Sequence, residues 1–168
     1  MGVPRTSPRG DRLLAIYLND HLAGATLGAR RARYLAEADI DASLGSSVSG
    51  LAADIADDRA ELMSIMRTLG IPLRRYKTGV AVAAELAGRL KPNGRVLQRS
   101  PLSTLEELEL LKLGIEGKAS GWRSLRSVAE RDGRLSVEQI DHLTQRAEDQ
   151  ARRVEELRRR VAAETFAA

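Results

Sequence analysis

Apolar residues at helical spacing, sustained over four long stretches, are the feature that most limits how this 168-residue chain can fold. Within each stretch they recur at intervals of three and four, so they form one stripe along a helix with 3.6 residues per turn. We predict helices over about 11–38, 46–69, 103–131 and 136–163. An amphipathic helix buries its stripe only against other elements, so the pattern predicts an all-α fold of packed helices.

Local signals mark several of the expected helix ends. Gly70 follows the second stretch and Pro72 stands just beyond it, which is typical of a helix C-terminus. Ser103 and Glu106 match a capping box, in which the hydroxyl accepts an amide proton and the glutamate reaches back to the cap. Ser136 is a favourable cap for the last helix. We therefore expect these helices to begin or end at the named residues.

The connections between the stretches differ in length. Short links join the first helix to the second and the third to the fourth, so each of these pairs should form antiparallel neighbours. About 33 residues, 70–102, separate the second helix from the third, and within them we predict a short helix over 80–90. We interpret this segment as a crossover that returns the chain to the other end of the bundle. Residues 1–9 are predicted to form a flexible arm, and 10–168 a single domain.

Two helical hairpins joined by one long crossover resemble the ferritin-like four-helix bundle superfamily, in one of its bacterial branches. The resemblance covers nearly the whole chain and consists of helix lengths and connections. It implies a pair of iron or manganese ions in the core, bound by a Glu from each of two helices and Glu-x-x-His from the other two. It also implies self-association, so we expect a homodimer or a larger homo-oligomer.

The metal ligands of that superfamily do not carry over to this chain. The only histidines are His21 and His142, and no Glu-x-x-His occurs. On a helical wheel, His142 points away from the apolar side of its helix, whose inner face carries Gln150 instead of a carboxylate. We therefore predict no standard di-iron site. A reduced or displaced iron or manganese site would use His21, Asp58 and Glu116. The other interpretation makes His21 a core histidine with a hydrogen-bond partner, and pairs Asp58 with an arginine.

Two further features of the core faces have alternative interpretations. Gly24 and Gly28, with alanines around them, give the first helix a thin side. That side is either a dimer face or cofactor slot, or the place where the second helix packs closely, which is the outcome we expect. Trp122 is expected to be a core anchor near the end of the bundle, and a ligand role would need an open pocket beside it.

Composition excludes several functional classes. The chain has no cysteine, which removes disulfides, thiolate metal sites and thiol nucleophiles, and no phosphate-binding glycine loop occurs. The net charge of +4 comes from 27 basic and 23 acidic residues that are interleaved, also within the arginine-rich stretch 152–160, and aromatic residues make up 3%. This pattern indicates solvated helix faces and argues against nucleic acid as a partner.

No apolar run approaches the roughly 20 residues of a membrane span, and since the first residues contain no apolar h-region we expect no secretory signal. Cytoplasmic localisation is the default expectation, with no membrane partner. We therefore expect a non-enzymatic helical-bundle protein with a binding or structural role and no cofactor. The alternative is a metal-binding redox or metal-storage protein of ferritin-like type with an atypical site.

Overall fold

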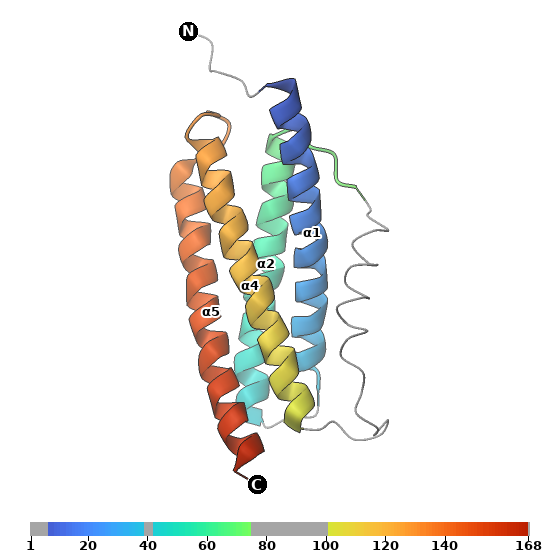
Figure 1. Ribbon diagram of the computed structural model, residues 1–168, viewed down its shortest axis with the longest axis vertical. Helices are drawn as coiled ribbons and strands as arrows, with labels where there is room; N and C mark the ends of the chain where they lie inside the picture. Colours follow the sequence, from blue (N-terminus) through green and yellow to red (C-terminus); the bar gives the residue numbers. More distant parts are fainter. Residues whose placement is uncertain (1–6, 39–41, 75–100, 168) are drawn as a thin grey trace.

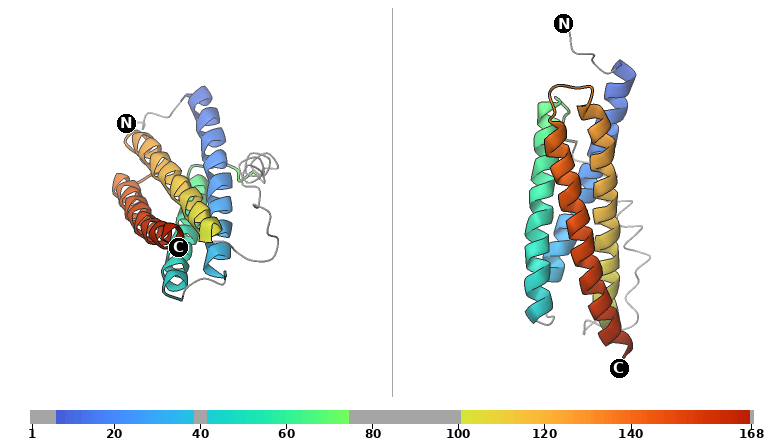
Figure 2. Two further views of the ribbon diagram at one scale, coloured as in Figure 1. Left: turned by 60° about the horizontal axis from the view of Figure 1, so that its bottom comes forward. Right: turned by 90° about the vertical axis from the view of Figure 1, so that its left-hand side faces the viewer.

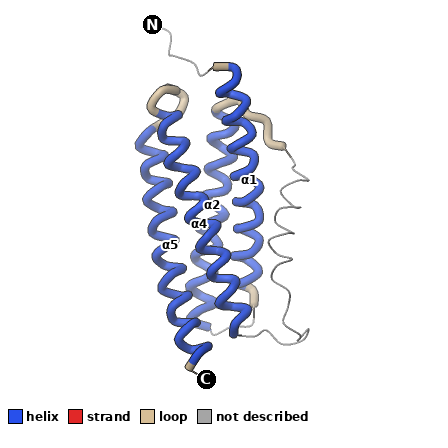
Figure 3. The backbone as a smooth tube through the Cα atoms, in the orientation of Figure 1, coloured by secondary structure: helices blue, strands red, loops and turns tan. Residues whose placement is uncertain are grey.

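The chain forms a bundle of long α-helices in the computed structural model, which describes residues 7–38, 42–74 and 101–167. These residues contain four helices and no strand (Figures 1 and 3). The helices are α1 (Pro8–Ala36), α2 (Ala42–Thr68), α4 (Pro101–Ala129) and α5 (Val137–Phe166). The prediction of an all-α four-helix bundle is confirmed. The predicted short helix over 80–90 lies outside the described residues.

The four helices associate mainly as two pairs. α1 packs along α2, and α4 packs along α5, each pair running antiparallel. α4 runs in the same direction as α2, and α5 in the same direction as α1 (Figure 1). Two further views show the pairs side by side (Figure 2). α1 and α4 contact each other over a smaller area, and α2 and α5 touch at few positions. The contact between the pairs is therefore carried largely by α1 and α4.

Two of the predicted helix ends are found where the sequence places them. Gly70 follows α2 with a φ of +71°, a conformation that glycine adopts without a Cβ clash. Its N–H donates to the Arg67 carbonyl at 3.0 Å, and the Ile71 N–H donates to the Met66 carbonyl at 2.8 Å, which together form a Schellman motif. At the start of α5, Ser136 Oγ accepts a hydrogen bond from the Gln139 N–H at 3.1 Å.

Three other predicted helix starts are wrong. α2 begins at Ala42 rather than near Ser46, so Gly45 lies inside the helix instead of before it. α1 begins at Pro8 rather than near Asp11, because Ser7 caps it and accepts a hydrogen bond from the Gly10 N–H at 3.1 Å. Helix α1 therefore includes the last two residues of the expected flexible arm; residues 1–6 lie outside the described residues. α4 begins at Pro101, so Ser103 and Glu106 lie inside the helix and form no capping box. Proline suits the first turn of α1 and of α4, since its fixed φ is helical and its missing N–H is not needed there.

The hydrophobic core consists of two clusters of buried side chains. Members of the cluster toward the α4–α5 turn include Leu18, Leu62, Met66, Leu125, Ile140 and Leu143. Members of the cluster toward the opposite end include Leu35, Val48, Leu51, Leu108, Val154 and Val161. Along α2, α4 and α5, the residues of one cluster give way to those of the other near the middle of each helix, and polar side chains stand near that point. They are described below. None of the described helices has an apolar stretch long enough to cross a bilayer.

Candidate functional site

A group of buried and half-buried polar residues, here called the polar layer, separates the two apolar clusters. It consists of Asp58 from α2, Lys118 from α4, and Arg146 and Gln150 from α5. The Asp58 side chain is 1% exposed. Its Oδ1 accepts from Arg146 Nε at 2.7 Å, and its Oδ2 accepts from Gln150 Nε2 at 2.9 Å and from Lys118 Nζ. One buried carboxylate therefore joins three of the four helices.

The charges of the polar layer do not balance. Asp58 carries one negative charge, and Lys118 and Arg146 each carry a positive charge, so the layer holds an excess of one positive charge. Lys118 Nζ also donates to Gln150 Oε1, and its side chain is 13% exposed. Burial lowers the pKa of Lys118, and the Asp58 carboxylate partly opposes that effect. The buried ammonium is thus held in place mainly by its contact with Asp58.

A groove of about 570 Å³ lies between α1 and α4, and Lys118 is one of the residues that line it. This α1/α4 groove falls within the size range of pockets that bind small molecules. Most of its described lining is apolar, with leucine and isoleucine side chains and small residues on both helices. The glycines that line it are Gly24 and Gly28 on α1, and Gly114, Gly117 and Gly121 on α4.

Glycines keep the groove open because neither helix fills it with side chains. The α4 glycines are three and four residues apart, so they share one helix face. A Cβ added at Gly24, Gly28, Gly114 or Gly117 would meet no described atom within 4 Å. The expectation that Gly24 and Gly28 serve close packing of the first two helices is therefore wrong. Their thin side faces α4, whose facing residues include glycines as well, so the α1/α4 groove stays open between the places where the two helices touch.

Polar contacts bracket the α1/α4 groove at its two ends. At one end, Tyr17 Oη donates to Ser124 Oγ at 3.0 Å. At the other, the Arg31 guanidinium donates two hydrogen bonds of 2.9 Å to the Glu107 carboxylate. Bidentate pairs of this kind have a fixed geometry. These contacts tie α1 to α4 on either side of the glycines and define the length of the groove.

Three aromatic side chains, those of Tyr17, His21 and Trp122, line one end of the groove. His21 packs edge-to-face on Tyr17, with ring centroids 4.4 Å apart, and a Cβ added at Gly121 would lie 2.9 Å from its Cε1 and Nδ1. Burial lowers the pKa of His21, partly opposed by the Asp20 carboxylate, so the neutral imidazole is favoured. Trp122 is buried, but no described residue accepts a hydrogen bond from its Nε1–H.

The three residues proposed for an atypical metal site do not form one cluster. Asp58 belongs to the polar layer and pairs with Arg146, as the structural interpretation of this residue predicts. His21 faces the groove, and no described residue hydrogen-bonds to its ring. Glu116 is exposed and pairs with Lys112 at 3.7 Å. Among the described residues, no three His, Asp or Glu side chains converge as metal ligands would.

Predictions from helix phase agree with the structure at two places. His142 is exposed and Gln150 is 1% exposed, so the inner face of α5 is the one that the apolar pattern indicates. The arginines of 152–160 are paired with acidic neighbours, as expected for a solvated face. The pairs are Arg152–Asp149, Arg153–Asp54, Arg158–Glu155, Arg159–Glu155 and Arg160–Glu164.

Comparisons of the chain with protein families, with curated proteins and with solved structures find no match, so its site is interpreted from its own geometry.

Sequence reasoning missed the partners of Asp58 and the α4 side of the groove. Lys118 and Arg146 are ordinary charged residues of amphipathic helices, and no local pattern distinguishes them from their exposed neighbours. The glycines Gly114, Gly117 and Gly121 do carry a signal, because they repeat at helical spacing as Gly24 and Gly28 do. Two glycine faces on different helices indicate either close packing or a gap, and sequence alone does not distinguish the two.

Proposed function

We propose that this chain is a non-enzymatic helical-bundle binding protein whose α1/α4 groove receives an apolar ligand. The observation that carries the proposal is the groove itself, about 570 Å³ in volume and lined largely by glycine, alanine and leucine. Leu113, a lining residue, is 64% exposed. Covering such apolar surface removes it from water, which favours binding by roughly 25 cal/mol for each Å² buried.

The polar layer supports a role without a di-iron centre. In ferritin-like metalloproteins, carboxylates and histidines from the helices project into the bundle core to bind the ions. Among the described residues, the middle of the core holds one carboxylate, and its oxygens already accept hydrogen bonds from Lys118, Arg146 and Gln150. Two fixed cations repel a metal ion, and a lysine, an arginine and a glutamine do not form a ligand set for iron or manganese. The residues present do not fit the metal pair.

The ferritin-like assignment remains part of the proposal. It is supported by the helix directions, since α2 and α4 run the same way and 26 residues, 75–100, stand between the described parts that contain them. Self-association and a cytoplasmic location are expectations that follow from the resemblance and from composition. Sedimentation velocity at several protein concentrations measures the assembly state, and a monomer at all of them would contradict self-association.

Binding of a neutral apolar probe tests the proposed function. We expect 1-dodecanol to bind the purified, delipidated chain in isothermal titration calorimetry. Gly117→Leu places a side chain in the groove and should weaken binding by about tenfold or more, a change of about 1.4 kcal/mol. Ala56→Leu creates the same side chain on the exposed face of α2, by adding one carbon fewer, and serves as the control. Binding that is absent, or that is equal in both variants, would contradict the proposal.

Metal analysis tests the alternative function. The chain is purified without chelator and its iron and manganese are measured. Stoichiometric metal that disappears in His21→Ala would establish a metal-binding protein with an atypical site. We expect no stoichiometric metal, and a midpoint of thermal unfolding that added iron or manganese does not raise.

A further inference from the structure

His21 places an unpaired imidazole in the α1/α4 groove. Its ring reaches from α1 to α4, where a Cβ added at Gly121 would lie 2.9 Å from its Cε1 and Nδ1. No described residue hydrogen-bonds to the ring, and neither ring nitrogen is fully buried. The residue is half-buried and lines the groove, so these nitrogens are open to a ligand there. The unpaired imidazole is an observation independent of the glycine faces.

An unpaired imidazole restricts what can fill this end of the groove. A polar group that is open to solvent hydrogen-bonds to water, and a ligand that covers the group removes that water. A buried polar group left without a partner costs free energy, so a site built around one rejects analogues that lack the matching atoms. A ligand that lies against His21 must therefore carry a hydrogen-bonding group at that point.

The charges around the groove favour an uncharged head group. Three charged residues line the described part of the groove, namely Asp20, Arg31 and Lys118. The Arg31 guanidinium is paired with the Glu107 carboxylate. The Lys118 ammonium is paired with the Asp58 carboxylate, so neither cation is available to an anionic ligand. Asp20 is exposed, and it disfavours an anion while adding little to the binding of a cation. A charged head group would lose its water without gaining a partner.

A hydroxyl is the uncharged group that suits the imidazole best. Burial lowers the pKa of His21, which favours the neutral ring with one N–H donor and one acceptor nitrogen. A hydroxyl accepts from the N–H or donates to the other nitrogen, whereas a carbonyl oxygen only accepts. A hydroxyl therefore pairs with whichever ring nitrogen it meets.

The rest of the groove suits a long apolar chain. His21 and Arg31 are 10 residues apart on α1, or about 15 Å at 1.5 Å per residue. The residues of α1 that line the groove between them are Gly24, Ala25, Leu27 and Gly28. On α4, Gly114 and Gly117 leave room for the chain, because a Cβ at either position would meet no described atom within 4 Å.

From these observations, and building on the proposed function, we propose that the groove binds a long-chain alcohol. The His21 imidazole hydrogen-bonds to the hydroxyl, and the alkyl chain lies along the glycine faces of α1 and α4 toward Arg31. The head group sets the orientation of the ligand, and the apolar chain supplies most of the buried surface.

1-Dodecanol and dodecanoate, which share one chain length, test whether the head group is uncharged. Calorimetry on the full chain, at a pH where the carboxylate is ionised, should give a dissociation constant for dodecanol about tenfold lower than for dodecanoate, because the carboxylate finds no counter-ion in the groove.

Variants of His21 test the hydrogen bond. His21→Phe keeps an aromatic ring but removes both nitrogens, and it should weaken dodecanol binding by about tenfold. His21→Gln keeps a donor and an acceptor and should recover part of the affinity. His142→Phe, at an exposed position, is the matched control and should bind as the wild type does. In NMR spectra of the wild type with labelled histidines, dodecanol should move the ring nitrogen resonances of His21 and leave those of His142 in place.

The possible outcomes separate this inference from the proposed function. Equal dodecanol affinity in wild type and His21→Phe, with unmoved His21 resonances, would overturn the alcohol site and leave an apolar groove in place. Dodecanoate that binds as tightly as dodecanol would also overturn the inference. Failure of both probes to bind would overturn both proposals. If His21→Phe does not fold, the His21 resonances and the comparison of the two probes in the wild type remain decisive.

Discussion

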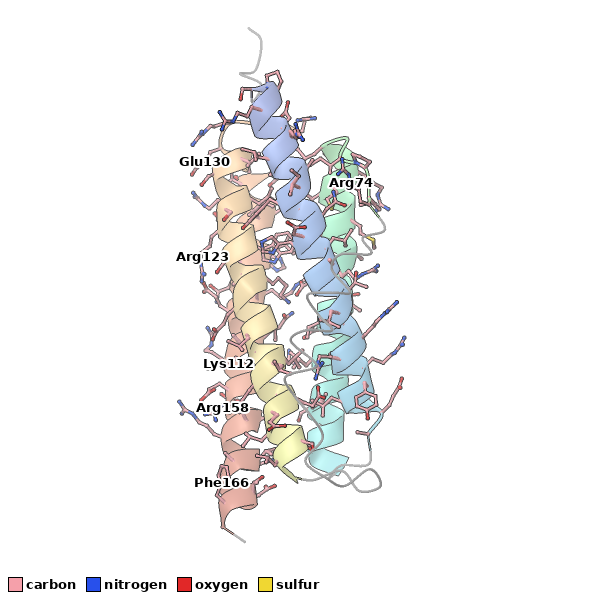
Figure 4. The ribbon with its side chains drawn as sticks, turned by 45° about the vertical axis from the view of Figure 1, so that its right-hand side comes forward. Arg74, Lys112, Arg123, Glu130, Arg158 and Phe166 are labelled. Carbon is pink, nitrogen blue, oxygen red and sulfur yellow. The ribbon has the colours of Figure 1, made fainter. Side chains whose placement is uncertain are left out.

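α4 presents two unlike sides to its neighbours. Toward α5 it packs over most of its length, and the exposed edge of that interface carries Lys112–Glu155 at 3.0 Å, Arg123–Glu148 at 2.5 Å and Arg126–Asp141 at 2.7 Å. Figure 4 shows Lys112 and Arg123 along this edge, on the side away from α1. Toward α1 it offers glycines, with polar contacts only at the two ends of the groove.

The difference shows how side-chain size decides whether two neighbouring helices pack tightly or leave a groove between them. Large apolar residues on α4 and α5 interdigitate and exclude water. Small residues bring helices together when nothing else holds them apart. Here α1 is held by α2 and α4 by α5, so facing glycines leave a groove instead. The packed side serves stability, and the open side is where we propose that a ligand binds.

The largest expected loss of stability comes from a substitution in the polar layer. Asp58→Asn leaves the largely buried Lys118 and the half-buried Arg146 without their anion, and breaking a buried ion pair in this way costs about 3–5 kcal/mol. Urea unfolding followed by circular dichroism measures the loss. Asp57→Asn, on the exposed face of the same helix, should change stability by about 0.5 kcal/mol or less. A loss at Asp58 no larger than at Asp57 would show that the polar layer contributes little to stability.

Replacing a leucine by alanine on each side of α4 compares how much the packed side and the groove side contribute to stability. Leu108 is 0% exposed, and Leu108→Ala should cost about 2–5 kcal/mol because it leaves a cavity in the core. Leu113 lines the groove and is 64% exposed, so Leu113→Ala should cost about 0.5 kcal/mol or less. The same unfolding experiment measures both. Similar losses for the two variants would mean that the groove side of α4 is packed after all.

Alanine at two groove glycines should shift stability in opposite directions. At Gly117 a methyl group meets no described atom, so Gly117→Ala should stabilise by about 0.5–1 kcal/mol through helix propensity. At Gly121 the methyl carbon would lie 2.9 Å from the His21 ring, and overpacking costs about 1–3 kcal/mol, which outweighs that gain. Adding His21→Ala to Gly121→Ala should remove the clash. If the penalty persists in the double variant, the imidazole is not its cause.

The smallest effect is a pH dependence that arises at His21. Burial lowers its pKa below 6.5, so between the folded-state pKa and 6.5 the unfolded chain binds more protons than the folded chain. Stability from the neutral imidazole is complete above 6.5 and is lost as the pH falls through that window. Wild type should therefore lose more stability on acidification than His21→Asn does. His142→Asn, at an exposed position, is the control and should follow wild type.

Much of the fold was predictable because its signals are local. Apolar spacing and the residues Gly70 and Ser136 are enough to identify four helices and two of their ends. Helix starts at Pro8 and Pro101 were misplaced because a proline is compatible both with a preceding loop and with a first turn. The exposed position of His142 and the burial of Gln150 also follow from helical phase, since each depends on one helix alone.

By itself, the sequence determined the helical class of this protein, the inner face of α5 and the mixed charges of its surface, because these properties depend on residues close together in the chain. Only the tertiary structure decided that Asp58 joins Lys118 and Arg146, and that glycines of α1 and α4 face one another across a groove. Those outcomes depend on how four helices are placed together, and a one-dimensional pattern holds no information about distances between residues on different helices.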